Sequence, residues 1–104
     1  MALEIYGHSL QLIRDMRGAL HAIAKHDLDL ARQARRALTS IPLNIAEGEG
    51  RTNGNARQRY ETAMGSANEV RACLQTADAL GYIEADATHV DRLDRIARTL
   101  NRLR

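Results

Sequence analysis

The sequence predicts an all-α protein, with residues 1–104 forming a single domain folded as an antiparallel up-down-up-down four-helix bundle. Four segments carry apolar residues at the three- and four-residue spacing of an amphipathic helix. The connections between these segments are short, which makes consecutive helices antiparallel neighbours. The apolar residues are mainly Ala, Leu and Ile, with no Phe or Trp, a composition that suits close helix packing. No stretch alternates long enough to predict a strand.

The first helix is predicted over residues 3–25. Its apolar positions fill an arc of roughly 200°, whereas a helix that contacts one core needs a stripe only a little over ~100° wide. The surplus predicts that this helix also packs against something outside its own bundle. The positions in the arc are Leu3, Ile5, Tyr6, Leu10, Leu12, Ile13, Met16, Ala19, Leu20 and Ile23.

The second helix is predicted to begin after Asp27, a favourable N-cap residue. Its apolar stripe continues on both sides of Pro42, the only proline in the chain. A proline inside a helix removes one backbone donor, so we expect a kinked helix and not two elements. The helix is expected to end near Gly48 or Gly50. The stripe comprises Leu30, Ala34, Ala37, Leu38, Ile41 and Ile45.

The segment "GEGRTNGN" is rich in Gly and Asn and predicts a loop. Asn55 is predicted to cap the third helix, which runs to about Leu80 and is followed by Gly81 as the residue that ends it. Asp86 is predicted to cap the fourth helix. The stripe of the third helix is Ala56, Tyr60, Ala63, Met64, Ala67, Val70, Leu74 and Ala77, and that of the fourth is Val90, Leu93, Ile96, Ala97, Leu100 and Leu103.

Motifs for catalysis or cofactor binding are absent from the sequence. Cys73 is the only cysteine, and Asp86–His89 is a lone acid-x-x-His pair without the second copy that a di-metal bundle would need. The glycine-rich loop lacks the Gly-Lys-Ser/Thr ending of a phosphate-binding loop. We therefore expect a protein that is not an enzyme and has no metal or cofactor. Because neither a long apolar run nor a signal peptide is evident, we expect a cytoplasmic location.

Arginine dominates the basic residues, and the net charge is +2. Arginine binds phosphate through paired hydrogen bonds, so arginine-rich helix faces are candidates for nucleic-acid binding. The alternative is a solvated face neutralised by interspersed acids, such as Asp91, which can pair with Arg95. The candidates lie opposite the apolar stripes of the second and fourth helices and are Arg32, Arg35, Arg36, Arg92, Arg95, Arg98 and Arg102.

Asn44, Glu47 and Arg51 share one flank of the second helix, beside its apolar stripe. We interpret them as structural: they would tie the turn to the third helix, where Ser66 and Glu69 are the expected partners. The alternative is a polar binding site near this turn.

Three segments together resemble a known family: "SIPLNIAEGEGR", "GSANEV" and "LGYI". They resemble the four-helix-bundle family named for proteins encoded in bacterial 23S rRNA intervening sequences, over about residues 34–83. Tyr60 and Met64 stand where that family usually has Phe. The resemblance implies a small cytosolic protein that forms ring-like homopentamers. Related bundle proteins accompany the reverse transcriptases of diversity-generating retroelements and bind nucleic acid through a basic surface.

These observations lead us to expect a non-enzymatic homo-oligomer, with a pentamer implied by the resemblance. Its arginine-rich faces are expected to bind RNA, another nucleic acid or a nucleic-acid-processing partner, and no membrane. The alternative is a structural or protein-interaction bundle with no nucleic-acid role.

Overall fold

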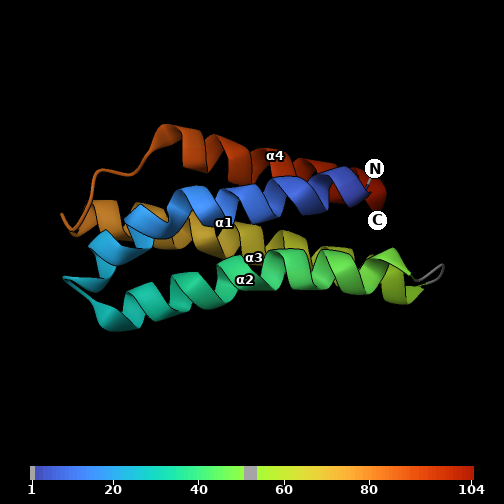
Figure 1. The fold of residues 1–104 in the computed structure, drawn as a ribbon, viewed down its shortest axis with the longest axis horizontal. Helices are drawn as coiled ribbons and strands as arrows, with labels where there is room; N and C mark the ends of the chain where they lie inside the picture. The colour runs from blue at the N-terminus through green and yellow to red at the C-terminus, as the bar shows by residue number, and fades with distance from the viewer. Residues whose placement is uncertain (1, 51–53) are drawn as a thin grey trace.

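The computed structural model describes residues 2–50 and 54–104, together with the side chains of residues 4–50 and 55–104. Four helices follow one another along the chain: α1 (Ala2–Ala24), α2 (Leu28–Glu49), α3 (Gly54–Ala79) and α4 (Ala87–Leu103). They lie side by side with alternating directions in a body of 43 × 23 × 20 Å (Figure 1). Each helix packs on its neighbours in sequence, and α1 also packs on α4. The predicted all-α four-helix bundle is confirmed.

Two of the three predicted N-caps are confirmed. The carboxylate of Asp27 accepts a hydrogen bond from the backbone N–H of Leu30 at 2.9 Å, and that of Asp86 accepts one from Thr88 at 2.8 Å. The prediction for Asn55 is wrong, because α3 already includes Gly54 and a cap residue lies outside the helical backbone. Gly and Asn both occur repeatedly in this segment, so composition alone did not locate the first helical residue.

The end of α3 has the geometry that the sequence predicts for a glycine-terminated helix. Gly81 has a φ of 79°, in the left-handed region that favours glycine. The N–H of Tyr82 donates to the carbonyl of Ala77 and the N–H of Gly81 donates to that of Asp78, each at 2.9 Å. These two bonds form a Schellman motif, which satisfies carbonyl groups left over at the helix end.

α2 continues through Pro42 as one helix and ends at Glu49, followed by Gly50 as C-cap. The prediction of one continuous element ending near Gly48 or Gly50 is therefore confirmed, and the kink at Pro42 stays a prediction. Pro42 is itself buried. The apolar face that α2 carries on both sides of the proline explains why the helix is not broken there, since tertiary packing outweighs the lost backbone bond.

The core lies along the bundle axis and is built from aliphatic side chains, with alanines between α2 and α3. The apolar arc of α1 divides into two parts. One part is fully inside the bundle, whereas Tyr6, Leu10, Ile13 and Leu20 are only partly buried. The largest completely buried apolar side chains are Leu12, Met16, Ile23, Leu38, Ile41, Ile45, Val70, Leu74, Leu93 and Leu100.

Candidate functional site

The predicted arginines form two separate surfaces. We call Arg32, Arg35 and Arg36 the α2 arginine surface, and Arg92, Arg95, Arg98 and Arg102 the α4 arginine surface. α2 and α4 lie at opposite edges of the bundle in Figure 1, and each packs on α1 and α3. One copy of the chain therefore presents its arginines in two different directions and does not unite them in one site.

The α2 arginine surface is open and unneutralised. Arg32, Arg35 and Arg36 are exposed and line a shallow groove along α2, with Asp29 at its N-terminal end. Within the described residues none of these three arginines makes an ion pair, and Asp29 makes none either. Their guanidinium groups keep all their N–H donors available to an external acceptor.

The α4 arginine surface is only partly neutralised. Arg92 Nη1 donates to Asp15 Oδ2 of α1 at 2.7 Å, and Arg102 Nη2 donates to Thr99 Oγ1 at 3.3 Å. Arg95 and Arg98 make no ion pair with any described residue, and the predicted Asp91–Arg95 pair does not form. Within the described residues, no acid of α4 itself forms an ion pair with any of these four arginines.

Two further carboxylates at the α3–α4 contact, those of Asp94 and Glu61, pair with arginines that are not among the predicted candidates. Arg71 of α3 bonds Asp94 at 2.6 Å, and Arg104 bonds Glu61 at 2.8 Å. These partners are far apart in the chain, so helical spacing gives no sign of them. Only the packing of α4 against α3 brings them together.

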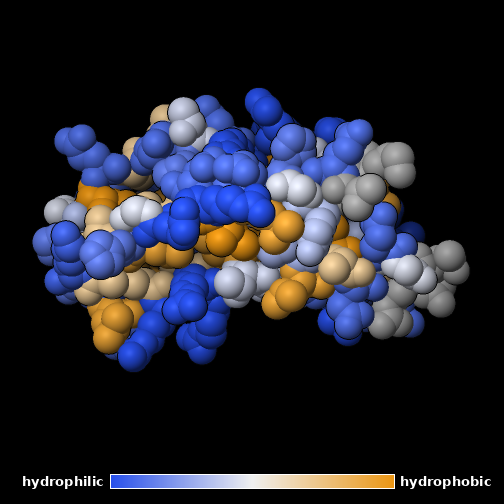
Figure 2. Space-filling model, viewed as in Figure 1, coloured by the Kyte–Doolittle hydropathy of each residue, from blue (hydrophilic) through white to orange (hydrophobic). Residues whose placement is uncertain are grey.

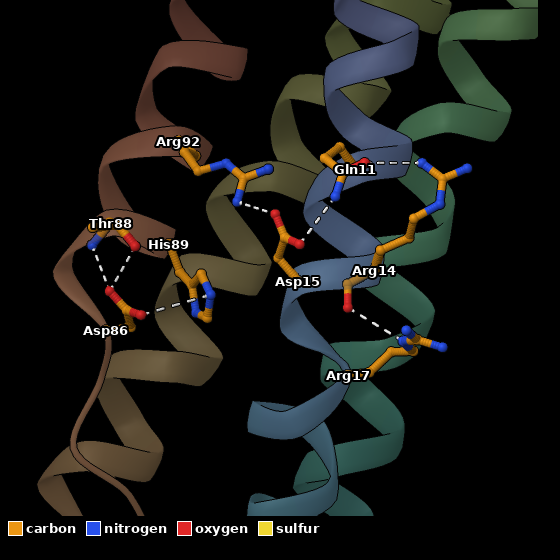
Figure 3. Close-up of polar contacts among 8 residues, drawn as sticks. All are labelled: Gln11, Arg14, Asp15, Arg17, Asp86, Thr88, His89 and Arg92. Carbon is orange, nitrogen blue, oxygen red and sulfur yellow. Dashed lines mark hydrogen bonds and ion pairs between the residues drawn. The ribbon is translucent and has the colours of Figure 1, made fainter.

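Asp15 is the centre of the polar contact between α1 and α4 (Figure 3). Its carboxylate accepts hydrogen bonds from Arg92 at 2.7 Å and from Gln11 at 3.0 Å. These bonds, Arg92 first, hold the pKa of Asp15 below its usual value. Nearby, His89 Nε2 lies 3.8 Å from Asp86 Oδ2, and His89 Nδ1 is buried without a hydrogen-bond partner in the described structure. The cluster joins α1 and α4.

Cys73 lies in the core of the bundle, as a small apolar side chain would. Cys73 is buried, and burial raises the pKa of its thiol, with the nearby Glu69 charge acting in the same direction. A raised pKa leaves the sulfur protonated and unreactive. Among the described residues no three His, Cys, Asp or Glu side chains gather as a metal site would require.

The polar cluster of α2 is organised by Ser40. The Nδ2 atom of Asn44 donates to the carbonyl oxygen and to Oγ of Ser40, both at 2.9 Å. The hydroxyl of Ser66 on α3 donates to Ser40 Oγ at 2.8 Å, and Arg59 approaches Asn44 Oδ1 at 3.5 Å. Asn44 and Ser66 are thus brought together across the α2–α3 contact, as the structural interpretation expects.

The other predicted members of this cluster are Glu47, Arg51 and Glu69. Glu47 is exposed beside Leu43 and Ala46, and Arg51 falls outside the described residues. Glu69 was expected as a partner of Asn44 and Glu47, but no hydrogen bond of the described structure joins it to Ser40, Asn44 or Ser66. Glu69 is exposed, and its negative charge helps to raise the pKa of the Cys73 thiol, one helical turn further along α3.

An apolar strip runs along the junction of α1 and α2, with hydrophilic side chains on both sides of it (Figure 2). Leu28 of this strip is far outside the core, since it is 52% exposed. We call this strip the α1–α2 seam. The apolar residues that line its grooves include Tyr6, Ile13, Leu20, Ala24, Leu28 and Ala46. Leu43 is 65% exposed and lines a separate groove formed by α2 residues alone.

No helix in the described part of the chain is long and apolar enough to cross a membrane. No curated protein and no solved structure is significantly similar to the chain. The family model described as 23S rRNA-intervening sequence protein matches residues 1–102. Since that match spans nearly the whole bundle, from α1 to the end of α4, the chain belongs to the family of 23S rRNA-intervening sequence proteins.

Proposed function

We propose that this protein is a non-enzymatic homo-oligomeric bundle that binds RNA through its arginine surfaces. One observation carries the proposal. Arg32, Arg35, Arg36, Arg95 and Arg98 are exposed and make no ion pair among the described residues. Arginines without a carboxylate partner are the groups that replace counterions along a phosphate backbone. The contacts would be to phosphate and shape, because the three tyrosines give few platforms for stacking bases.

The α1–α2 seam supports the assembly part of the proposal. Large exposed apolar patches usually mark interfaces, and Leu28 of the seam would be removed from water by a second copy. A cyclic arrangement repeats each arginine surface around the assembly, so that weak phosphate contacts act together on one RNA. Following the family resemblance, we propose five copies and a relation to the accessory proteins of diversity-generating retroelements, which are described as binding nucleic acid through a basic surface.

A mobility-shift titration with a structured RNA, repeated between ~50 mM and ~200 mM salt, tests RNA binding directly. We expect binding at low salt that weakens steadily as salt rises, because phosphate contacts release counterions. Arg36→Gln should reduce the slope of that salt dependence by about one unit. Arg104→Gln is the matched control, since Arg104 is exposed but its guanidinium already pairs with Glu61 at 2.8 Å. Absence of binding at ~50 mM salt would contradict the proposal.

A second candidate function is a protein-interaction bundle without a nucleic-acid role. The one observation that favours it is the exposed apolar α1–α2 seam. This function predicts an oligomer whose stability and size are unaffected by RNA and which shows no shift in the same titration. The two functions are therefore separated by one experiment on one preparation.

A further inference from the structure

A small cleft between α1 and α4 has a composition unlike the rest of the surface. It has a volume of about 60 Å³ and is lined by Ile5, His8, Arg92, Arg95 and Ile96. Ile5 and Ile96 are 4% and 3% exposed, so they form an apolar floor. Every polar side chain on its rim is basic. The small size of the cleft suits one small ionic group.

The rim presents donors and positive charge. Arg95 is exposed and has no ion-pair partner among the described residues. Arg92 donates one of its N–H groups to Asp15, and its other N–H groups remain available to a ligand. Because the charge of Asp15 offsets that of Arg92, the charge of Arg95 remains, and His8 adds a donor from the facing helix. A cation is disfavoured here, and an oxyanion with several acceptor oxygens is favoured.

We propose that this cleft is a subsite for a single phosphate group, contacted by Arg92 and Arg95 of α4 and His8 of α1. The inference rests on the proposed RNA-binding function, because the phosphate it takes would be one phosphodiester of the RNA backbone. The hydrogen bond that Arg92 donates to Asp15 fixes the guanidinium of Arg92 before the ligand arrives, while the apolar floor weakens local screening by water. The α4 arginine surface then contains one ordered contact beside exposed arginines such as Arg98.

Nuclear magnetic resonance of the native assembly, titrated with inorganic phosphate at constant ionic strength, tests the cleft itself. We expect saturable shifts at the amides of residues 8 and 95. Arg95→Gln should weaken phosphate binding by about tenfold, the effect of losing one charged hydrogen bond. Arg98→Gln removes the same charge from an exposed arginine of the same helix that does not line the cleft, and should leave binding unchanged. Shifts that never saturate, or equal effects of both variants, would overturn the subsite.

The source of the phosphate is distinguished by a second arm with a structured RNA. If the RNA backbone occupies the cleft, RNA should abolish the phosphate-induced shifts, and Arg95→Gln should weaken RNA binding more than Arg98→Gln does. RNA binding that is equally sensitive to both variants would overturn the subsite while leaving the proposed function intact. Saturable phosphate binding without any RNA binding would instead refute the proposed function and identify the ligand as free phosphate.

Discussion

Gly48 of α2 faces the ring of Tyr60 on α3 so closely that a Cβ atom at position 48 would lie 2.7 Å from Cε1 of the tyrosine. Carbon atoms that are not bonded normally stay ~3.5–4.0 Å apart. The ring has little room to retreat, since Tyr60 is only 8% exposed and its hydroxyl approaches Glu49 Oε2 at 3.5 Å. The glycine of the "NIAEG" segment is therefore a packing requirement between two helices.

Gly48→Ala is expected to destabilise the fold by about 1–3 kcal/mol, the usual cost of forcing an extra carbon into a packed contact. Urea denaturation measures it. Gly65→Ala is the control, because Gly65 lies inside α3 with no atom within 4 Å of an added Cβ. That change should stabilise by about 0.5–1 kcal/mol through helix propensity. In a Tyr60→Leu background the penalty of Gly48→Ala should shrink; an undiminished penalty would show that the ring is not its cause.

Ser40→Ala is expected to cost about 1–3 kcal/mol in the free energy of unfolding, because Ser66 loses its acceptor and Asn44 loses one of two. Thr62→Ala serves as the reference, since its hydroxyl bonds only Gln58 of its own helix and is exposed. We expect the reference to change stability by less than ~0.5 kcal/mol. Equal denaturation midpoints for the two variants would rule out the structural role of the Ser40 cluster.

The Asp15–Arg92 contact makes part of the stability depend on acid pH. The pKa of Asp15 is lowered in the folded state from an ordinary value of 3.8, chiefly by the Arg92 hydrogen bond. Its contribution is therefore complete above pH 3.8 and is lost as the pH falls through the lower, folded-state pKa. In thermal melts between neutral pH and about pH 2, the melting temperature of Asp15→Asn should fall less on acidification than that of the native protein. Asp91→Asn, on the exposed face of α4, should retain the decline of the native protein.

The seam predicts which exposed leucine matters for assembly. Leu28 lies on the α1–α2 seam and is 52% exposed, whereas Leu80 is 55% exposed just after the end of α3. Leu28→Glu should reduce the assembly to smaller species while leaving the helical content unchanged, because a charge cannot be buried there unpaired. Leu80→Glu should leave the mass of the assembly unchanged. Sedimentation velocity measures the mass of the assembly, and circular dichroism checks that each variant is folded. If both variants assemble to the same extent, the proposed interface is wrong.

Local features of the fold could be predicted from the sequence because their causes are local. Asp27, Asp86 and Gly81 act on backbone groups within a few residues, and all three were predicted correctly. The contacts of the candidate surfaces could not be predicted in the same way. Asp15 and Arg92 are 77 positions apart, and Asp91 and Arg95, which helical spacing would pair, do not pair.

The same distinction explains the α2–α3 cluster. Asn44 and Ser66 were recognised as polar residues of the junction, but Ser40 was not recognised as the residue that connects them. A serine hydroxyl inside a helix has several acceptors within reach, so its partner depends on how the two helices pack. Here Ser66 lies across the contact at 2.8 Å, which only the three-dimensional structure reveals.

The most direct test of the homo-oligomeric scaffold is the mass of the protein in solution, measured by static light scattering at micromolar concentration. We predict a single species of five times the chain mass of 11.6 kDa. A dimer or tetramer would contradict the number of copies but not the interface. A mass of one chain, 11.6 kDa, would contradict the account of the α1–α2 seam and of the repeated arginine surfaces that depend on it.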